Sequence, residues 1–504
     1  MSTFTLDGAR AGEDSGYDRR WWVLAVLAIA QLMIIVDASI VNIALPSAQK
    51  ALHISTADRQ WVVTAYTLAF GGLLLLGGRV ADYMGRKRVL LVGLLGFAGA
   101  SAIGGFAPDA TLLFAARALQ GGFAALMAPA ALSLISVTFT EPRERARAFG
   151  VYGAISGGGL AVGLIAGGLL TQFASWRWCL LVNVPIALAA GLAGSRLIPE
   201  SRMSGRARYD LPGAITATAG MATLVYAVTK ASTDGWTAPL TVALLGVAVA
   251  LLVSFAVAEL RSPAPLLPLR VVTNRVRGGS FLATLLVGVG MMGTFLFLTF
   301  YLQQTLHYSA LKTGFAYLPF SLGIVTAAAV ASKAAIRVAP RVLMGVGLGM
   351  AIVGMLMFSR VGVHTGYWTL LFPAELVMSL GMGLVFVPVN STALAGVAAS
   401  DSGVASALIN TSQQVGGSVG TALLNTIFTT ASTSYAASHL SLGKSVFRLA
   451  TIHGYSVAFL VAAGFLGLAL VSTVGLINAR AVGSPEAGPE DDGSPVEELA
   501  PALL

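Results

Sequence analysis

The sequence has little cysteine and little charge. Cys179 is the single cysteine among 504 residues, so an internal disulfide is excluded and we expect a packing role for this thiol. Charged residues make up 11% of the chain and hydrophobic residues 56%, which excludes a soluble multidomain protein. The phosphate-binding loop Gly-x-x-x-x-Gly-Lys-Ser/Thr does not occur, which excludes an ATP-driven pump. We expect neither enzymatic activity nor a metal or organic cofactor.

Apolar runs of helix length fill the sequence instead, and each is long enough to cross a bilayer as a helix. The polar segment 1–20 is not followed by a small-residue cleavage site, so we expect a retained first span and not a signal peptide. The sequence therefore predicts an all-α polytopic membrane protein. The fourteen predicted spans are residues 22–45, 60–78, 89–106, 111–135, 147–172, 178–198, 211–230, 238–259, 278–302, 313–335, 342–359, 367–388, 402–428 and 455–478.

The net charge of +9 suggests a nucleic-acid partner until the basic residues are placed between the spans. If the N-terminus is cytoplasmic, the cytoplasmic segments hold 22 of the 31 Lys and Arg residues, and the outer segments hold 8. This asymmetry follows the positive-inside rule. We therefore expect a multi-pass protein of the plasma (inner) cell membrane with both termini in the cytoplasm and no bound nucleic acid.

One carboxylate, Asp37, interrupts the first span. It lies about 22 Å along the helix from Trp22, which is membrane depth. A charge at this depth has to face protein or water, and its default interpretation is functional. Arg117 of the fourth span lies at a similar depth and shares a helix face with Gln120, so we predict that it pairs with Asp37. The alternative is that Arg117 extends to the outer interface.

A second intramembrane acid, Glu375, lies in the later half of the chain. Of the 22 acidic residues, only Asp37 and Glu375 fall well inside predicted spans, at matching depth. Met378 and Met382 lie on the same side as Glu375 at helical spacing and offer an adaptable surface, although core packing explains methionines equally well. We predict substrate contacts for Asp37, Glu375 and both methionines.

Two further clusters are candidates for substrate contact. Aromatic and amide residues end the ninth span, although a lipid-facing or interfacial position also explains such aromatics. Polar residues mark the thirteenth span as an interior helix, for which hydrogen bonding between helices is the competing role. The candidates are Phe297, Tyr301, Gln304, Asn410 and Gln414.

The turn between spans two and three carries a charged glycine motif, residues 78–90. Glycines allow a tight turn, and an aspartate can face the positive end of a helix, so we predict a conformational gating loop. A purely positive-inside loop explains the basic run but not the glycines and the aspartate together. The predicted gating residues are Gly78, Asp82, Gly85, Arg86, Lys87 and Arg88.

The fifth span carries a stripe of small residues that allows close contact between helices. The predicted packing motif is Gly153, Gly157, Gly163, Gly167 and Gly168.

The spans divide as six, two and six, which indicates an internal duplication with an inserted helical pair. A degenerate basic loop with Lys333, Arg337 and Arg341 repeats the position of the first-half loop. The predicted regions are a cytoplasmic tail (1–20), a six-helix bundle (21–200), a two-helix linker (201–260), a second six-helix bundle (261–480) and a disordered acidic cytoplasmic tail (481–504).

These motifs together resemble the major facilitator superfamily, and within it the drug:proton antiporters with fourteen spans. The likeness rests on the loop from Gly78 to Leu90, on Arg117 to Gly121, on the glycines of the fifth span and on the run from Asp401 to Gly420. The fifth-span motif of that family usually has proline after its central glycine, whereas this chain has Leu164.

The resemblance implies two six-helix bundles plus two inserted helices, and export of hydrophobic, cationic or amphipathic small molecules such as drugs or antibiotics. The resemblance also implies that the proton gradient supplies the energy, without ATP, and that the partners are the lipid bilayer, the substrate and protons. We expect a monomer in which Asp37, Arg117 and Glu375 couple transport to protons. The alternatives are a lipid or amphipathic-metabolite transporter of the same fold and a membrane sensor that does not transport.

Overall fold

The computed structural model describes residues 7–201, 210–262, 265, 267, 269–335, 337–395, 397, 402–439 and 445–478. In these ranges the chain is helical and contains no strand. The predicted acidic tail, 481–504, lies outside the described residues, as does the segment 202–209.

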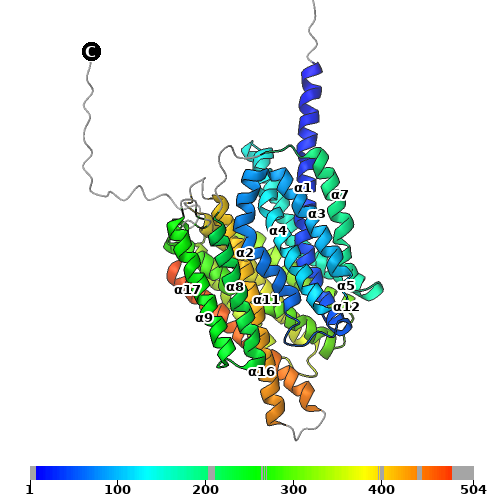
Figure 1. Ribbon diagram of the computed structural model, residues 1–504, viewed down its shortest axis with the longest axis vertical. Coiled ribbons are helices and arrows are strands. Elements are labelled where there is room, and N and C mark those ends of the chain that lie inside the picture. Colours follow the sequence, from blue (N-terminus) through cyan, green and yellow to red (C-terminus); the bar gives the residue numbers. More distant parts are fainter. Residues whose placement is uncertain are drawn as a thin grey trace, which may run out of the picture.

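The first half of the chain forms one bundle of long helices, drawn in blue to green in Figure 1. Its helices are α1 (Asp7–Ala51), α2 (Trp61–Met84), α3 (Arg86–Gly105), α4 (Ala110–Thr138), α5 (Pro142–Phe173), α6 (Trp178–Leu181) and α7 (Asn183–Leu197). Within this bundle, α4 packs against α2 and α3, and α5 packs against α1. Local capping supports the helix starts, since the Asp109 carboxylate accepts a hydrogen bond from the Leu112 N–H at 2.9 Å at the start of α4.

The second half forms a similar bundle after two intervening helices. These two are α8 (Leu211–Asp234) and α9 (Pro239–Arg261). The bundle then comprises α10 (Leu269–Val272), α11 (Arg275–Phe300), η1 (Tyr301–Thr305), α12 (Ala310–Ala316), α13 (Leu318–Ala334), α14 (Pro340–Phe358), η2 (Tyr367–Leu371), α15 (Phe372–Leu394), α16 (Ser402–Ser438) and α17 (Val446–Leu476). The helices α8 and α9 pack on each other, and α8 also contacts α2 and α16 (Figure 1).

The two bundles meet most extensively along two pairs of helices. One pair is α2 with α16, and the other is α5 with α12. The first contact is close because Gly71 of α2 has no side chain, and a Cβ built there would lie 2.9 Å from Cβ of Gln414. The end of the molecule that carries the turn between α1 and α2 is called the α1–α2 end below, and the opposite end is called the α2–α3 end.

Each of the fourteen predicted spans corresponds to one of these helices or to two consecutive ones. Eleven helical segments in the described ranges are apolar and long enough to cross a membrane, and α5, α8 and α16 occupy the other three positions. Several helices extend past the predicted spans. The longest extensions are those of α1, which begins at Asp7, α16, which continues to Ser438, and α17, which begins at Val446. The extensions of α16 and α17 form a helical hairpin at the α1–α2 end (Figure 1). The extension of α16 is small and polar, which lowers the hydropathy there, whereas the start of α17 is largely apolar.

Candidate functional site

Asp37 is the centre of a polar cluster inside the first bundle. Its Oδ2 accepts a hydrogen bond from Arg117 Nη1 at 2.6 Å, which makes a salt bridge between α1 and α4. Its Oδ1 accepts hydrogen bonds from Gln120 Nε2 at 3.0 Å and from Asn183 Nδ2 at 2.8 Å. The predicted pairing of Asp37 with Arg117 is therefore confirmed as a contact, and three helices contribute to it.

The guanidinium of Arg117 is held on several sides. Its Nη1 also donates to Gln120 Oε1 at 2.8 Å, and its Nε donates to the Val62 carbonyl at 2.9 Å. Its Cζ lies 4.4 Å from the centre of the Tyr66 ring, within range of a cation–π interaction. Asp37 is 0% exposed and Arg117 1% exposed. The alternative in which Arg117 extends to an interface is therefore wrong for this structure.

Sequence reasoning missed the outer partners of this cluster. Ser101 of α3 accepts a hydrogen bond from Gln120 Nε2 at 2.7 Å, and Tyr66 of α2 covers the guanidinium. The signal available in the sequence was a set of single polar residues inside otherwise apolar spans. Together these residues bring α1, α2, α3, α4 and α7 to one buried ion pair, so a change in the charge of Asp37 would act on most of the bundle.

Glu375 lies in a different environment, in the first turn of α15. Its side chain is 0% exposed, and within the described chain neither carboxyl oxygen has a hydrogen-bond partner. Tyr367 and Tyr317 lie nearby, but the Tyr367 hydroxyl donates to the Ala316 carbonyl at 2.7 Å and the Tyr317 hydroxyl donates to the Phe295 carbonyl at 3.0 Å. A buried carboxylate without a partner is costly, so this surrounding suits the neutral, protonated form.

The two intramembrane acids do not share one network in this structure. The hydrogen-bond partners of Asp37 belong to the first bundle, whereas Glu375 belongs to α15 of the second and lies near Tyr317 and Tyr367 of the same bundle. A direct exchange of one substrate between the two carboxylates therefore requires rearrangement of the bundles. Their substrate roles stay predictions.

Four further substrate candidates lie in the core of the second bundle. Met378, Met382, Phe297 and Tyr301 are buried in the apolar core, where Phe297 stacks on Phe428 with ring centres 5.4 Å apart. Tyr301 donates its hydroxyl proton to the Gly362 carbonyl at 2.7 Å. The packing interpretation of these four residues accounts for what the structure shows, and their contact with substrate stays a prediction.

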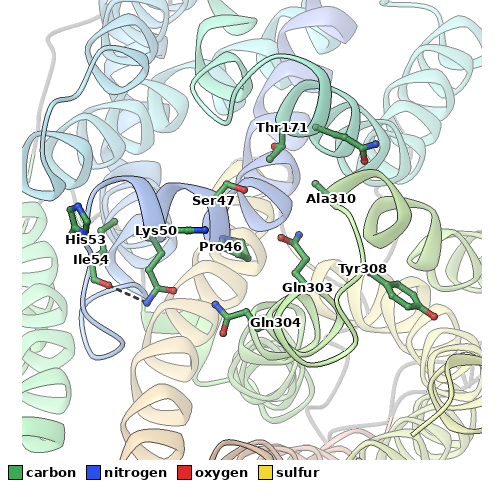
Figure 2. Close-up of a pocket in the computed structure, with 12 residues that line it drawn as sticks. Pro46, Ser47, Lys50, His53, Ile54, Thr171, Gln303, Gln304, Tyr308 and Ala310 are labelled. Carbon is green, nitrogen blue, oxygen red and sulfur yellow. Dashed lines mark hydrogen bonds between the residues drawn. The ribbon is translucent and has the colours of Figure 1, made fainter. Parts of the chain in front are cut away.

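The three amide candidates differ in their surroundings. Asn410 of α16 is exposed and donates to the Ser406 carbonyl at 3.1 Å. Gln414 lies at the contact between α16 and α2. Gln304 lines a cavity of about 740 Å³ at the α1–α2 end. In Figure 2, Gln303 and Gln304 face this cavity from η1, opposite Pro46 and Lys50 of α1.

The predicted gating loop joins α2 to α3 through Gly85. This glycine has a φ of +109°, in the region that side chains rarely adopt, and a Cβ there would lie 2.7 Å from Glu200 Oε1. Asp82 accepts hydrogen bonds from Arg86 Nε at 3.2 Å and Nη2 at 2.9 Å. Arg86 is the first residue of α3, so these side-chain bonds join the last turn of α2 to the start of α3. Gly78 is in ordinary contact with Pro129 of α4.

Glu200, which follows α7, fastens this loop and was missed by sequence reasoning. Its Oε1 accepts a hydrogen bond from the Lys87 N–H at 3.2 Å, and its Oε2 lies 3.5 Å from Arg88 Nε. The Arg86 N–H donates to the Ser201 carbonyl at 2.9 Å, and Lys87 Nζ donates to the Ser195 carbonyl at 2.7 Å. The loop is thus tied to the end of α7, so its movement would move α7 with it. Gating by the loop stays a prediction.

The glycines of α5 fit the predicted packing role. Gly163 and Gly167 face α1, where a Cβ at Gly167 would lie 2.9 Å from the Ile40 carbonyl oxygen. Gly168 faces α12 of the other bundle, where a Cβ would lie 2.7 Å from Cα of Leu311. The surroundings of Gly153 and Gly157 are outside the described part. The helix continues through Leu164 without a break from Pro142 to Phe173.

We expect Gly163→Ala to destabilise the protein by about 1–3 kcal/mol through overpacking. A Cβ at this position overlaps Ser39 Oγ and lies 3.0 Å from the Val36 carbonyl oxygen. Gly158→Ala on the same helix is the matched control, because a Cβ there meets nothing within 4 Å. Thermal unfolding in detergent, followed by tryptophan fluorescence, measures both variants. Equal midpoints for the two would contradict the packing role of Gly163.

Comparison with known proteins gives consistent matches. A family model described as Major Facilitator Superfamily matches residues 27–421. The puromycin resistance protein pur8 of Streptomyces alboniger is 52% identical over 474 residues, which cover 93% of this chain and 94% of that protein. The cephamycin export protein CmcT of Amycolatopsis lactamdurans is 38% identical, covering 89% of this chain and 94% of that protein. The crystal structure of the POT family transporter PepTSo has a TM-score of 0.63 at 15% identity, covering 90% of this chain and 98% of that chain, and it shares the fold.

Proposed function

Because this chain belongs to the major facilitator superfamily, a family of membrane transporters, we propose that it is a proton-coupled exporter of amphipathic small molecules. The observation that supports proton coupling best is the buried salt bridge between Asp37 and Arg117. An intramembrane ion pair is expensive to build and marks proton relays in transporters. The bilayer, the substrate and protons are the proposed partners, without ATP or a cofactor, and the proposed working unit is a monomer.

Protonation of Asp37 is the proposed coupling step. A proton on the carboxyl group removes the negative charge that faces Arg117, so the guanidinium turns toward its other acceptors, Gln120 Oε1 and the Val62 carbonyl. The contacts that join α1 to α4 and α7 then weaken, and the bundle can change shape. Loss of the proton restores the ion pair. The carboxyl group thus links its protonation state to the arrangement of the helices.

Glu375 is the proposed second proton carrier. Its buried, unpartnered carboxyl suits the protonated form in this structure, and exposure to water or to a cationic substrate would favour release of the proton. Substrate and proton would then compete for a negative charge, which is the requirement for exchange of one against the other. Movement of the two bundles about the α2–α16 and α5–α12 contacts would expose the binding region alternately to each side.

The proposed substrates are drug-like molecules, and the orientation follows the charge distribution. Two of the similar proteins are named for puromycin resistance and cephamycin export, which supports export of antibiotics by this chain. The excess of Lys and Arg at the α2–α3 end supports an orientation in which this end faces the bacterial cytoplasm and the α1–α2 end faces outward.

Expression in a bacterium that lacks its own drug exporters tests this function. We expect the wild-type chain to raise the inhibitory concentration of puromycin and to lower ethidium accumulation, and a protonophore to abolish both effects. Loss of both effects under ATP depletion with an intact proton gradient would contradict the proposed energy source. If the protein is present in the membrane and neither compound is exported, the drug function is wrong, and lipids of the same amphipathic character are the next substrates to test.

A further inference from the structure

Arg59 is a buried cation that the proton mechanism does not use. It belongs to the turn between α1 and α2, yet its side chain is only 2% exposed. In the described chain it forms no salt bridge with an acidic residue. A buried charge without a counter-ion needs another source of stabilisation.

Aromatic rings of the other bundle supply that stabilisation. The Arg59 Cζ lies 4.0 Å from the ring centre of Phe300 in α11 and 4.9 Å from that of Phe428 in α16. Both distances fall within the range of cation–π interactions, which are strongest when the cation is removed from water. The guanidinium therefore occupies a pocket of aromatic faces.

The aromatic pocket continues beyond these two rings and is built by the second bundle alone. Phe428 and Tyr455 of α17 have ring centres 4.9 Å apart, and Tyr301 meets Tyr455 edge to face at 6.0 Å. We call Phe297, Phe300, Tyr301, Phe428 and Tyr455 the aromatic box. All five are buried.

The turn that carries Arg59 is also docked on the second bundle. Arg59 Nε donates to Asn425 Oδ1 at 3.3 Å. The same asparagine donates from Nδ2 to the carbonyls of Thr56 at 3.0 Å and Ala57 at 3.3 Å. Arg59 therefore joins the two bundles at the α1–α2 end, and separation of the bundles at this end would withdraw the guanidinium from the aromatic box.

We propose that the aromatic box is a binding site for organic cations, and that Arg59 is its internal occupant when the two bundles are closed at the α1–α2 end. This inference rests on the proposed export function. Opening of that end exposes the box to an aromatic or quaternary-type cation, and the bound cation keeps Arg59 out. Release of the cation lets Arg59 return, which closes the bundles again.

Competition between Arg59 and the ligand gives a measurable consequence. An organic cation binds only the fraction of molecules in which the box is vacant, so its apparent affinity is reduced by that fraction. We expect Arg59→Met to raise the apparent affinity for ethidium by about tenfold, because methionine fills space without the charge. Arg59→Lys keeps a cation and should bind ethidium nearly as the wild type does.

Fluorescence titration of the purified full-length chain with ethidium measures this effect. Arg177→Met is the matched control, because Arg177 also stacks on an aromatic ring, Trp176 at 4.6 Å, and bonds to the Gly105 and Ala107 carbonyls, all within the first bundle. The control should leave ethidium binding unchanged. Adding Phe428→Leu to Arg59→Met should remove the gain.

The following results would overturn the proposal. Wild-type affinity in a folded Arg59→Met variant shows that Arg59 does not occupy the site, and a gain that survives Phe428→Leu shows that the cation binds elsewhere.

If Arg59→Met does not fold, the single variant Phe428→Leu tests the proposal. Its export of ethidium should fall more than its export of a neutral drug, and an equal fall excludes a cation site. Wild-type export in the same membranes tests the proposed function separately, since binding in detergent does not depend on transport.

Discussion

Replacing Arg117 with methionine is expected to destabilise the protein by about 3–5 kcal/mol, which is the cost of leaving a buried charge without its partner. Asp37 would keep the amides of Gln120 and Asn183 but lose the cation at 2.6 Å. Those amides carry no net charge. A fall in the thermal unfolding midpoint and in the yield of monodisperse protein in detergent would report this loss.

A double variant separates the charge from the packing. In Asp37→Asn combined with Arg117→Met, both charges are absent and the volumes are nearly kept, so most of the lost stability should return while export stays absent. An uncharged pair of similar shape is often no less stable than a buried ion pair. Equal destabilisation in the single and double variants would mean that Arg117 stabilises the fold through its contacts with Val62 and Tyr66, and not through Asp37.

The second large effect is expected for Asp37→Asn, which should abolish export driven by the proton gradient. Because this change also leaves the buried Arg117 without its counter-ion, export is compared at equal amounts of folded protein in the membrane. Asparagine matches the shape of aspartate and offers one acceptor, but it cannot take up or release a proton. Asp58→Asn is the matched control, since Asp58 is an exposed carboxylate in the turn between α1 and α2 that accepts a hydrogen bond from Ser55 Oγ at 2.7 Å. Export by Asp37→Asn at the wild-type rate would remove Asp37 from the mechanism.

The sequence predicts the spans and the ion pair between Asp37 and Arg117 well, because both depend on properties that can be read along the chain. Helix positions follow from the length of apolar runs, and the pairing of Asp37 with Arg117 follows from their matching depths and from the cost of an isolated charge. The glycines of α5 were predicted to allow close packing, and the structure places Gly163 and Gly167 against α1.

Contacts between segments far apart in the chain could not be predicted from the sequence. Glu200 fastens the loop between α2 and α3 from the far end of α7, and nothing in its local sequence indicates this partner. Arg59 looks like an ordinary loop cation, and only the docking of its turn on α16 reveals the aromatic pocket. The matching depths of Asp37 and Glu375 predicted substrate contacts for both, but depth does not specify which bundle encloses a side chain.

The hairpin extensions of α16 and α17 illustrate a further limit. The residues that follow position 428 in α16 are polar enough to end a predicted span, yet α16 remains helical to Ser438. Hydropathy measures the preference for lipid and not the tendency to form a helix, so it places the membrane boundary and misses the helix end.

Transport in proteoliposomes with an imposed pH gradient tests the proton-coupled exporter most directly. A fluorescent lipophilic cation is followed in vesicles that contain wild type, Asp37→Asn or Glu375→Gln, with and without the gradient. We predict that the wild type moves the dye only when the gradient is present, and that Asp37→Asn shows no gradient-driven movement of the dye. Gradient-dependent movement of equal rate in wild type and Asp37→Asn, or wild-type movement that ignores the gradient, would contradict the account.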